Sequence, residues 1–424
     1  MSLIKTSFWT GFSTLIKAFF SYFLWKIIAV YTGPAGLATI EQFQNFIQIC
    51  RSFSSCLNQG VIKYVSEYKE DEENRSKILS NAFVIYATVS IFMSLLLCLF
   101  STQISEKIFS SIDYRYNIIL LGVSISIYSI NCLLLSVLNA ELEIKKYASC
   151  NIFNTVLFFI LTVYLLINYG IQGGLIGFIL NQCLSLIFTI YLVTKNKWFK
   201  LIEYFQGIDW NSINKILKFA SISFVPIIIT PLASFILRKY IAFELSWDEA
   251  GYWQGITKLS DGYISLMELM VGVYFLPKLS NIRISSQFKN EIFRSYGLII
   301  PIVLFGTLAI FILKKQIVKT LYSEQFLPML VLFKFQLIGD IARIGTWLLA
   351  IIMAAKAQIR ILVTAEITFN FSYVLLTMLC VHYFGLIGTS IGFAINSIIY
   401  FLWMTLCTSQ CIRSGSFKLV MDAA

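Results

Sequence analysis

Six lysine and arginine residues lie inside long apolar segments of this 424-residue chain. They are Lys17, Lys26, Arg51, Lys258, Lys334 and Arg343. A cation in hydrocarbon costs at least about 2.5–3.5 kcal/mol on insertion scales, so it is retained where it has a use or can reach the membrane surface. Several cations around one water-filled cavity would attract a multiply charged anion. These residues therefore predict the binding of an anionic substrate.

The composition sets the broad class of protein. Hydrophobic residues make up 58% of the chain and charged residues 13%, whereas a soluble domain has about 45–50% apolar and about 25% charged residues. The chain is therefore predicted to be a polytopic membrane protein. Its net charge of +11 is spread through short connections, which a positive-inside bias explains better than nucleic-acid binding.

The residue types that usually bind metals or catalyse reactions are sparse or poorly spaced. The nine cysteines fall in apolar segments or at their ends, where they act as small hydrophobic residues. His382 is the only histidine, which argues against a histidine-based metal site or catalytic triad. The sequence contains no GxxxxGK[ST] loop, so direct use of ATP is not expected. We expect neither metal nor cofactor, and no enzymatic activity.

A transmembrane helix needs about 20 largely apolar residues. Twelve segments satisfy this length: 10–31, 36–61, 78–101, 116–139, 148–167, 171–194, 216–239, 249–276, 295–313, 328–354, 361–382 and 386–409. Residues 31–35 are expected to form a tight turn. Arg238 and Lys239 are assigned to a loop on the side opposite the N-terminus. Most other loop lysines and arginines lie on the N-terminal side, so both termini are predicted to be cytoplasmic. The first residues lack the features of a cleaved signal peptide, so the first segment is expected to remain as a helix.

The chain repeats itself weakly at half its length. Leu24-Trp-Lys-Ile-Ile-Ala29 is similar to Leu237-Arg-Lys-Tyr-Ile-Ala242, 213 residues later, and Ala35-Gly36 is similar to Ala250-Gly251, 215 residues later. Such a repeat is typical of transporters built from two bundles around a midplane site. We predict two six-helix bundles, residues 1–194 and 216–424. The linker between them, residues 195–215, is expected to lie along the membrane surface.

Two helices carry a polar stripe at helical spacing. In residues 36–61 the stripe consists of Glu41, Gln44, Asn45, Gln48, Ser52, Ser55 and Gln59; in residues 249–276 it consists of Gln254, Lys258, Asp261, Ser265 and Glu268. Polar groups without partners cost about 4–8 kcal/mol each in a non-bonding solvent, so each stripe must face protein or water. Their equivalent positions favour a central hydrophilic cleft. The alternative is hydrogen bonding between packed helices.

Candidate substrate-binding residues follow from these stripes and cations. They are Lys17, Arg51, Lys258, Arg343, Glu41, Gln48, Gln254 and Trp253. Lys17 lies roughly 15 Å into its helix, too deep to reach the surface easily. Arg51 lies off the stripe, either at the rim of the cleft or against a neighbouring helix. Trp253 would stack on a sugar ring or belong to an interfacial belt.

Ion coupling and gating also have candidates. The acidic candidates Asp261, Glu268, Asp340 and Glu366 lie in apolar segments. Asp261 and Glu268 are seven residues apart on one face, where proximity and burial would raise a carboxylate pKa and let the group carry a proton. The alternative is a structural network in which Lys258 pairs with Asp261, and Arg343 with Asp340. Pro226 and Pro231 predict a kink in their helix, which is either a gate or a static bend.

Several stretches, in this order along the chain, resemble Wzx-type flippases of lipid-linked oligosaccharides. They are residues 13–17 (STLIK), 33–37 (GPAGL), 246–255 (SWDEAGYWQG) with Ser260-Asp261, 336–340 (QLIGD) and 354–357 (AAKA) with Arg360 and Glu366. These flippases form the polysaccharide-transporter branch of the multidrug/oligosaccharidyl-lipid/polysaccharide (MOP) exporter superfamily. The chain looks most like the enterobacterial branch that contains common-antigen and O-antigen flippases.

The resemblance implies a MATE-like V-shaped fold in the bacterial inner membrane. It implies movement of undecaprenyl-pyrophosphate-linked O-antigen units from the cytoplasmic to the periplasmic leaflet by alternating access. A polysaccharide polymerase and a chain-length regulator are candidate partners. A common-antigen flippase for a lipid-linked trisaccharide and a MATE-type drug/cation antiporter are the alternatives. A membrane polysaccharide polymerase is disfavoured because the outer loops are short.

Overall fold

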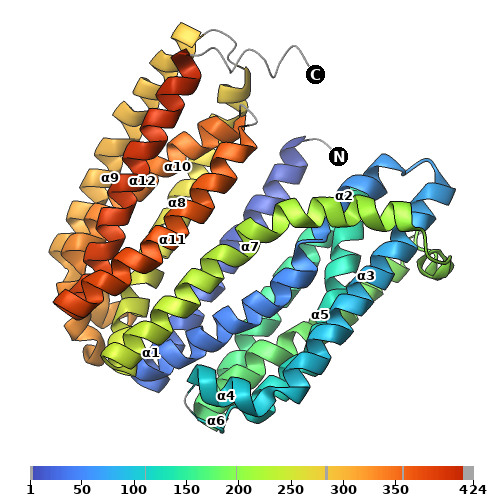
Figure 1. The fold of residues 1–424 in the computed structure, drawn as a ribbon, viewed down its shortest axis with the longest axis horizontal. Coiled ribbons are helices and arrows are strands. Elements are labelled where there is room, and N and C mark those ends of the chain that lie inside the picture. The colour runs from blue at the N-terminus through green and yellow to red at the C-terminus, as the bar shows by residue number, and fades with distance from the viewer. Residues whose placement is uncertain (1–2, 110, 197, 282–284, 356–357, 414–424) are drawn as a thin grey trace. The chain divides into compact units, whose positions relative to one another are not determined.

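The structure, a computed structural model, describes residues 3–109, 111–196, 198–281, 285–355 and 358–413. Every regular element in these ranges is helical, as predicted (Figure 1). The elements are α1 (Leu3–Ser55), α2 (Asn58–Glu67), α3 (Glu72–Leu99), α4 (Ser101–Phe109), α5 (Arg115–Ala140), α6 (Ile144–Thr194), η1 (Leu201–Phe205), α7 (Trp210–Glu244), α8 (Trp247–Asn281), α9 (Ser285–Leu321), η2 (Glu324–Val331), α10 (Phe333–Ala355), α11 (Ile359–Phe384) and α12 (Leu386–Arg413).

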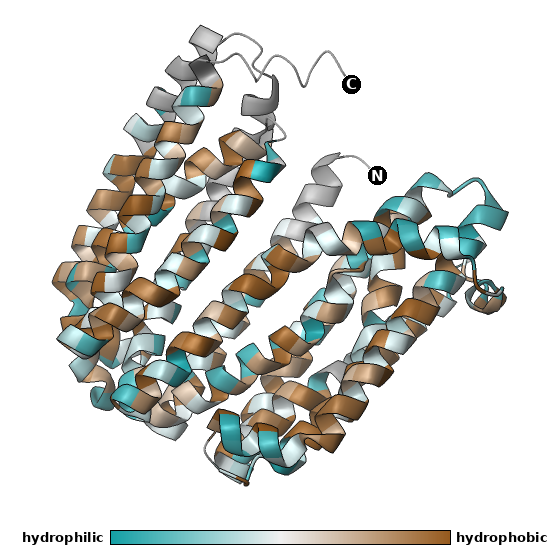
Figure 2. Cartoon of the chain, viewed as in Figure 1, coloured by the Kyte–Doolittle hydropathy of each residue, from teal (hydrophilic) through white to brown (hydrophobic). Residues whose placement is uncertain are grey.

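Nine segments of the described chain are helical, long and apolar enough to cross a membrane. Figure 2 shows hydrophobic residues along most of each long helix and hydrophilic residues at the connection between α2 and α3. Two of the nine segments, Gly11–Glu67 and Ile144–Thr194, have 57 and 51 residues, more than twice the roughly 20 that one span needs. The count of twelve spans and the cytoplasmic termini stay predictions.

Each of these two long segments is divided by a glycine. Gly33 has φ 66° and ψ −172°, and Gly170 has φ 60° and ψ −146°. Glycine adopts a positive φ without the steric cost of a Cβ. Pro34 follows Gly33, and its fixed φ suits the first turn of the next helix. The break in α1 therefore lies in residues 31–35, where the sequence predicts a turn.

By its internal contacts the chain divides into two compact units. Unit 1 comprises residues 1–32 and 39–232, and unit 2 comprises residues 33–38 and 233–424. The chain changes unit before Gly33, returns after Ala38, and changes again after Leu232, which follows Pro231. Residues 195–215, predicted as a linker, belong to unit 1 in this division. The bundle limits at residues 194 and 216 stay a prediction.

Both units contain a helix hairpin built on glycines at the same spacing. In unit 1 the hairpin is formed by the two halves of α6, and in unit 2 by α11 and α12. Gly170 and Gly385 form the turns, with φ of 60° and 59° and ψ of −146° and −141°. A Cβ at Gly173 or Gly388 would lie 2.0 or 2.1 Å from the carbonyl oxygen eight residues earlier. Glycine is required there because the two backbones are in direct contact.

One turn further along, the same contact recurs. A Cβ at Gly177 would lie 2.7 Å from the Cα of Thr162, and a Cβ at Gly392 would lie 2.6 Å from the Cα of Thr377. All these equivalent residues are 215 positions apart, which is the offset between Ala35-Gly36 and Ala250-Gly251. The weak repeat in the sequence therefore corresponds to a repeated structural element.

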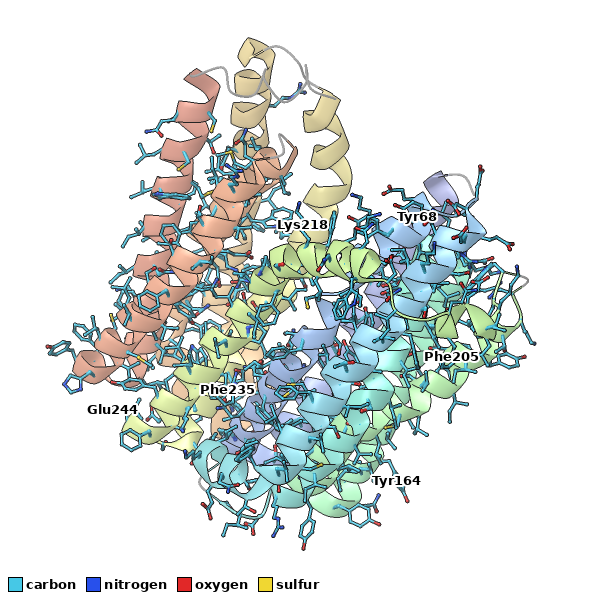
Figure 3. The ribbon with its side chains drawn as sticks, turned by 45° about the vertical axis from the view of Figure 1, so that its right-hand side comes forward. Tyr68, Tyr164, Phe205, Lys218, Phe235 and Glu244 are labelled. Carbon is cyan, nitrogen blue, oxygen red and sulfur yellow. The ribbon has the colours of Figure 1, made fainter. Side chains whose placement is uncertain are left out.

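The helix α7 contains both Pro226 and Pro231 and continues as one helix to Glu244. In Figure 1 its first part runs sideways past α2 before the helix turns, and Figure 3 places Lys218 on that first part. The apolar window of α7 is Ser223–Glu244. The predicted span, residues 216–239, lies within α7, but the helix continues to Glu244, so the charged pair Arg238-Lys239 belongs to the helix and not to a loop.

Candidate functional site

Arg51 lies in the second half of α1, where α5 and α6 pack against it. Its Nη2 donates to the carbonyl oxygen of Phe178 at 3.5 Å, and its guanidinium carbon lies 4.9 Å from the centre of the Tyr128 ring. Its buried Nε has no hydrogen-bond partner. In the described part of the chain, no carboxylate lies within ion-pair distance of Arg51. The structure therefore places this guanidinium against neighbouring helices and leaves its charge without a counter-ion from those residues.

A hydrogen-bonded network fixes the aromatic ring beneath Arg51. The hydroxyl of Tyr128 and that of Ser55 are 2.8 Å apart. One turn along α5, the Cys132 thiol donates to the Asn58 side-chain oxygen at 3.1 Å, and Tyr86 donates to the same oxygen at 2.5 Å. These contacts join α1, α2, α3 and α5. The ring is thus held in place, and the position of the guanidinium is set by packed helices.

The other candidates in unit 1 differ in their exposure. Lys17 lies in the first half of α1 with an exposed side chain. No carboxylate of the described residues is within ion-pair distance of it. On the stripe of the second half of α1, Glu41 and Asn45 are buried and Gln48 is exposed. The stripe therefore faces protein along part of its length and is open at Gln48.

Asp340 is the most enclosed acidic candidate in unit 2, and its side chain has no exposed surface. Ser260 donates to its Oδ2 at 2.7 Å, and the hydroxyl of Tyr263 donates to the same oxygen. Gln336, one turn earlier on α10, donates to Oδ1 at 3.4 Å. A carboxylate in this setting has its charge stabilised by hydroxyl and amide donors from α8 and α10. This group can hold a proton or a small cation away from bulk water.

Arg343 and Asp261 join the same two helices at a more open position. Nη1 of Arg343 lies 2.8 Å from Oδ1 of Asp261, and the side chains are 41% and 48% exposed. One-turn spacing suggested instead that Arg343 pairs with Asp340 and that Lys258 pairs with Asp261. The structure gives Asp261 a partner 82 residues away, which local spacing cannot reveal. Lys258 is half-buried on α8.

The interior of unit 2 contains a cation that the sequence analysis placed in a loop. Arg238 is 1% exposed, donates to the side-chain oxygen of Gln254, and has its guanidinium carbon 5.5 Å from the centre of the Trp253 ring. The loop assignment of Arg238 was wrong because α7 continues to Glu244. In the sequence repeat, Arg238 is equivalent to Trp25, which lies inside a predicted helix. That equivalence could have placed Arg238 in a helix.

The positions of Gln254 and Trp253 follow from this contact. Their side chains are 3% and 2% exposed, inside unit 2. Protein encloses both residues in this arrangement, so their contact with a substrate stays a prediction. Glu366 is half-buried on α11, and the side chain of Glu268 lies outside the described residues. Within the described ranges, no group of three or more histidine, cysteine, aspartate or glutamate residues is placed to hold a metal ion.

The fold is that of the MOP-superfamily transporters. An inward-facing multidrug resistance transporter of the MATE family superposes with a TM-score of 0.78 at 14% identity, covering 93% of this chain and 95% of that one. The inward closed lipid II flippase MurJ superposes with a TM-score of 0.77 at 17% identity, covering 96% of this chain and 87% of that one. At these identities the likeness concerns the fold alone.

The family described as "Polysaccharide biosynthesis protein" matches residues 42–331, more than half of the chain, and the chain belongs to this family. The lipid III flippase of Escherichia coli (strain K12) is 27% identical over 409 residues, 95% of this chain and 97% of that protein. A putative O-antigen transporter of Shigella flexneri is 21% identical over 433 residues, with 94% and 96% coverage. The predicted polysaccharide family is confirmed, the fold is the predicted MATE-like fold, and the long apolar helices are those of a multi-pass membrane protein.

Proposed function

We propose that the protein moves undecaprenyl-pyrophosphate-linked O-antigen repeat units from the cytoplasmic to the periplasmic leaflet of the inner membrane. It does so by alternating access, coupled to an ion gradient. Membership of the polysaccharide biosynthesis family and the near full-length match to a lipid III flippase and a putative O-antigen transporter support this function. Twelve spans in two bundles with cytoplasmic termini belong to the same proposal, as do a polysaccharide polymerase and a chain-length regulator as partners.

The single observation that carries the proposal is Arg51. A guanidinium within a membrane helix bundle, with no carboxylate of the described residues in ion-pair distance, favours the binding of an anion. A pyrophosphate offers several oxygens that an arginine can engage through parallel N–H groups. The Tyr128 ring beneath Arg51 and the carbonyl of Phe178 occupy one side of the guanidinium. In the proposal, the outer N–H groups of Arg51 bind the pyrophosphate, and the polyprenyl tail stays in the lipid.

The remaining polar candidates take part around this anion site. Lys17 and Arg343 attract the pyrophosphate during entry and transfer, and Lys258 does the same from α8. Sugars are bound through hydrogen bonds by Glu41, Gln48 and Gln254 and by stacking on Trp253. For Gln254 and Trp253 this requires unit 2 to open, because both are enclosed in the present arrangement.

Ion coupling is assigned first to Asp340. Its enclosed carboxylate and its hydroxyl donors, Ser260 and Tyr263, support a group that binds and releases a proton as the surroundings open. Asp261, Glu268 and Glu366 are the further candidates. One charge that moves through 100 mV releases about 2.3 kcal/mol, enough to bias the direction of transport. Pro226 and Pro231 serve as the gate, and the change of unit one residue after Pro231 supports this role.

The test is translocation of a labelled undecaprenyl-pyrophosphate oligosaccharide in proteoliposomes. We expect glycan to reach the far leaflet with the intact protein, and Arg51→Gln and Lys17→Ala to lower the rate at least tenfold. Lys26→Ala is the matched control, because Lys26 lies in the same half of α1 as Lys17 but closer to the break at Gly33. If Asp340→Asn or Asp261→Asn abolishes the dependence on a pH gradient, proton coupling is supported.

The same assay with other substrates distinguishes an O-antigen flippase from a common-antigen flippase and from a drug/cation antiporter. Preference for a lipid-linked common-antigen trisaccharide over an O-antigen unit would assign the common-antigen substrate instead. Absence of glycan transfer with any lipid-linked oligosaccharide, together with uptake of a cationic dye, would replace the proposal with a drug/cation antiporter.

A further inference from the structure

Unit 1 carries an apolar surface that no helix of the unit covers. Five apolar residues in η1, in the connection after it and at the start of α7 have 63–73% of their surface exposed: Leu201, Ile202, Phe205, Ile208 and Trp210. Leu217, also exposed, follows Trp210 by seven residues and so lies on the same face of α7. The adjoining face of α7 packs into the core of unit 1 through Ile213, Ile216 and Ala220. We call residues 201–217 the apolar surface segment.

This segment lies at the level where several membrane helices of unit 1 end. The helix α3 begins at Glu72, α5 ends at Ala140, and α6 ends at Thr194, seven residues before the segment. Residues of α3 and α5 contact the segment. Figure 3 places Lys218 and Tyr68 at one end of unit 1 and Tyr164 at the other. Figure 2 shows η1 as mostly hydrophobic beside the hydrophilic α2–α3 connection. The apolar side chains are thus exposed at the edge of the membrane-spanning region.

A buried ion cluster holds the segment against α3 and α5. Arg75, at the start of α3, lies 3.1 Å from a carboxylate oxygen of Glu141 and 3.0 Å from one of Glu203, and each of the three side chains is at most 7% exposed. Arg75 also donates to the carbonyl oxygen of Trp198 at 3.3 Å. Because Glu203 lies in η1, this cluster ties the apolar surface segment directly to two membrane helices.

Backbone hydrogen bonds extend this clamp. The buried Ser80 hydroxyl accepts from the amide of Gln206 at 3.1 Å and donates to the carbonyl oxygen of Gly207 at 3.1 Å. The buried Asn81 side chain accepts from the amide of Asp209 at 2.8 Å. The segment therefore has one fixed face on the protein, and its apolar side chains have a fixed orientation away from it.

Three lysines around the segment have partners. Lys200 lies 3.0 Å from Glu72, Lys215 donates to the Tyr68 hydroxyl at 3.0 Å, and Lys195 donates to the Tyr191 hydroxyl at 2.6 Å. The nearby α2–α3 connection also contributes Glu67, Glu70, Asp71, Glu72 and Glu73. Attraction of anionic lipid requires a cluster of basic residues with excess positive charge. The lysines and acidic residues here leave little excess positive charge, so attraction of anionic lipid to this segment is weak.

We propose that the apolar surface segment is a membrane-docking surface that inserts into the boundary between headgroups and acyl chains, and that its partner is phospholipid regardless of headgroup charge. Aliphatic side chains with a phenylalanine and a tryptophan are the residues that occupy this boundary. The clamp through Arg75 and Glu203 sets the depth at which the segment lies. Unit 1 is thereby held at a fixed level in the bilayer by a surface outside its spanning helices.

Photo-crosslinking from the full-length protein in liposomes tests the proposal. A benzophenone amino acid replaces Ile202 or Phe205, and the control replaces Glu70, an exposed residue of the α2–α3 connection. We expect lipid capture at positions 202 and 205 to exceed that at position 70 severalfold. Capture should be equal in phosphatidylcholine alone and with added phosphatidylglycerol, and unchanged by high salt. Capture no greater than at position 70, or capture that requires phosphatidylglycerol, overturns the proposal.

The clamp has its own test in the same assay. Arg75→Gln leaves two buried glutamates facing each other and should lower lipid capture at position 205 severalfold. Lys77→Gln is the matched control. Lys77 lies two residues after Arg75 on the same helix and forms an exposed ion pair with Glu73. Equal capture in both variants would contradict the role of the clamp.

Discussion

Arg343 on α10 and Asp261 on α8 form an ion pair with 2.8 Å between nitrogen and oxygen, although both side chains remain more than 40% exposed. One turn earlier on α10, Asp340 is completely buried and receives hydrogen bonds from Ser260 and Tyr263 of α8. Two acidic contacts between the same helices therefore differ sharply in their environment. The first contact is open to solvent, whereas the second is enclosed between α8 and α10.

Asp261→Asn and Arg343→Gln are expected to change stability little and transport strongly. An exposed ion pair contributes about 0–1 kcal/mol, so the unfolding temperature of the detergent-solubilised protein should move only slightly. Translocation should fall at least tenfold if the pair exchanges partners with an anionic substrate. The double variant Asp261→Arg/Arg343→Asp restores the pair and separates the two roles. Full transport by that variant would show that the pair is only structural.

Tyr263→Phe is expected to destabilise the protein because it removes a donor from a buried carboxylate. Hydrogen bonds to charged groups contribute about 1.5–3 kcal/mol, against about 1 kcal/mol for neutral ones. Tyr296→Phe is the matched control, since Tyr296 donates to the neutral carbonyl oxygen of Gly345 at 2.7 Å. Thermal unfolding should show a larger decrease for Tyr263→Phe. In an Asp340→Asn background the difference between the two tyrosine variants should shrink.

Gly173→Ala and Gly388→Ala are expected to destabilise their units to a similar extent. Each new Cβ would lie 2.0 or 2.1 Å from a backbone carbonyl oxygen. Overpacking of this kind costs about 1–3 kcal/mol or more. Gly306→Ala in α9 is the control, because nothing lies within 4 Å of its Cβ position. There, alanine should stabilise the helix by about 0.5–1 kcal/mol. Equal unfolding temperatures for all three variants would contradict the backbone contact.

Acidification is expected to strengthen the attachment of η1. Burial raises the pKa of Glu203 above its ordinary value, and the charge of Arg75 opposes this shift only in part. A carboxyl group with a raised folded-state pKa contributes stability that is present below its unfolded pKa and lost as the pH rises through the folded value. Hydrogen exchange of residues 198–209, corrected for intrinsic rates, should therefore slow between pH 7.5 and pH 5. Faster exchange at pH 5 would mean that the ion pair outweighs desolvation.

Local patterns predicted much of the fold. The apolar windows fell on the long helices of the described chain, and Gly33-Pro34 marked the break in α1. The echo of Leu24–Ala29 in Leu237–Ala242 pointed to the repeat, which the glycines make explicit in the structure. Arg238 was misplaced for a physical reason: an adjacent pair of cations has the composition of a loop, whereas here one of them is enclosed by Gln254 and Trp253.

The side-chain contacts of the candidate site were harder to predict from local sequence patterns. Spacing along one helix can suggest that Arg343 meets Asp340, but only the packing of α8 on α10 brings it to Asp261. The contact of Arg75 with Glu203 joins residues 128 positions apart, and neither residue type nor spacing signals it. Arg343 and Asp261 were predictable as functional candidates, but their pairing depended on tertiary structure.

The hairpins at Gly170 and Gly385 have a consequence for how such chains diverge. In each hairpin, the close approach of the two helices depends on a few glycines. The surrounding positions need only remain apolar where they meet lipid. Sequences of this fold can therefore drift widely while the spacing of three glycines persists. We expect distant members to be recognised more reliably by that spacing, found twice in one chain, than by overall identity, which has already fallen to 21% for a relative aligned over 94% of this protein.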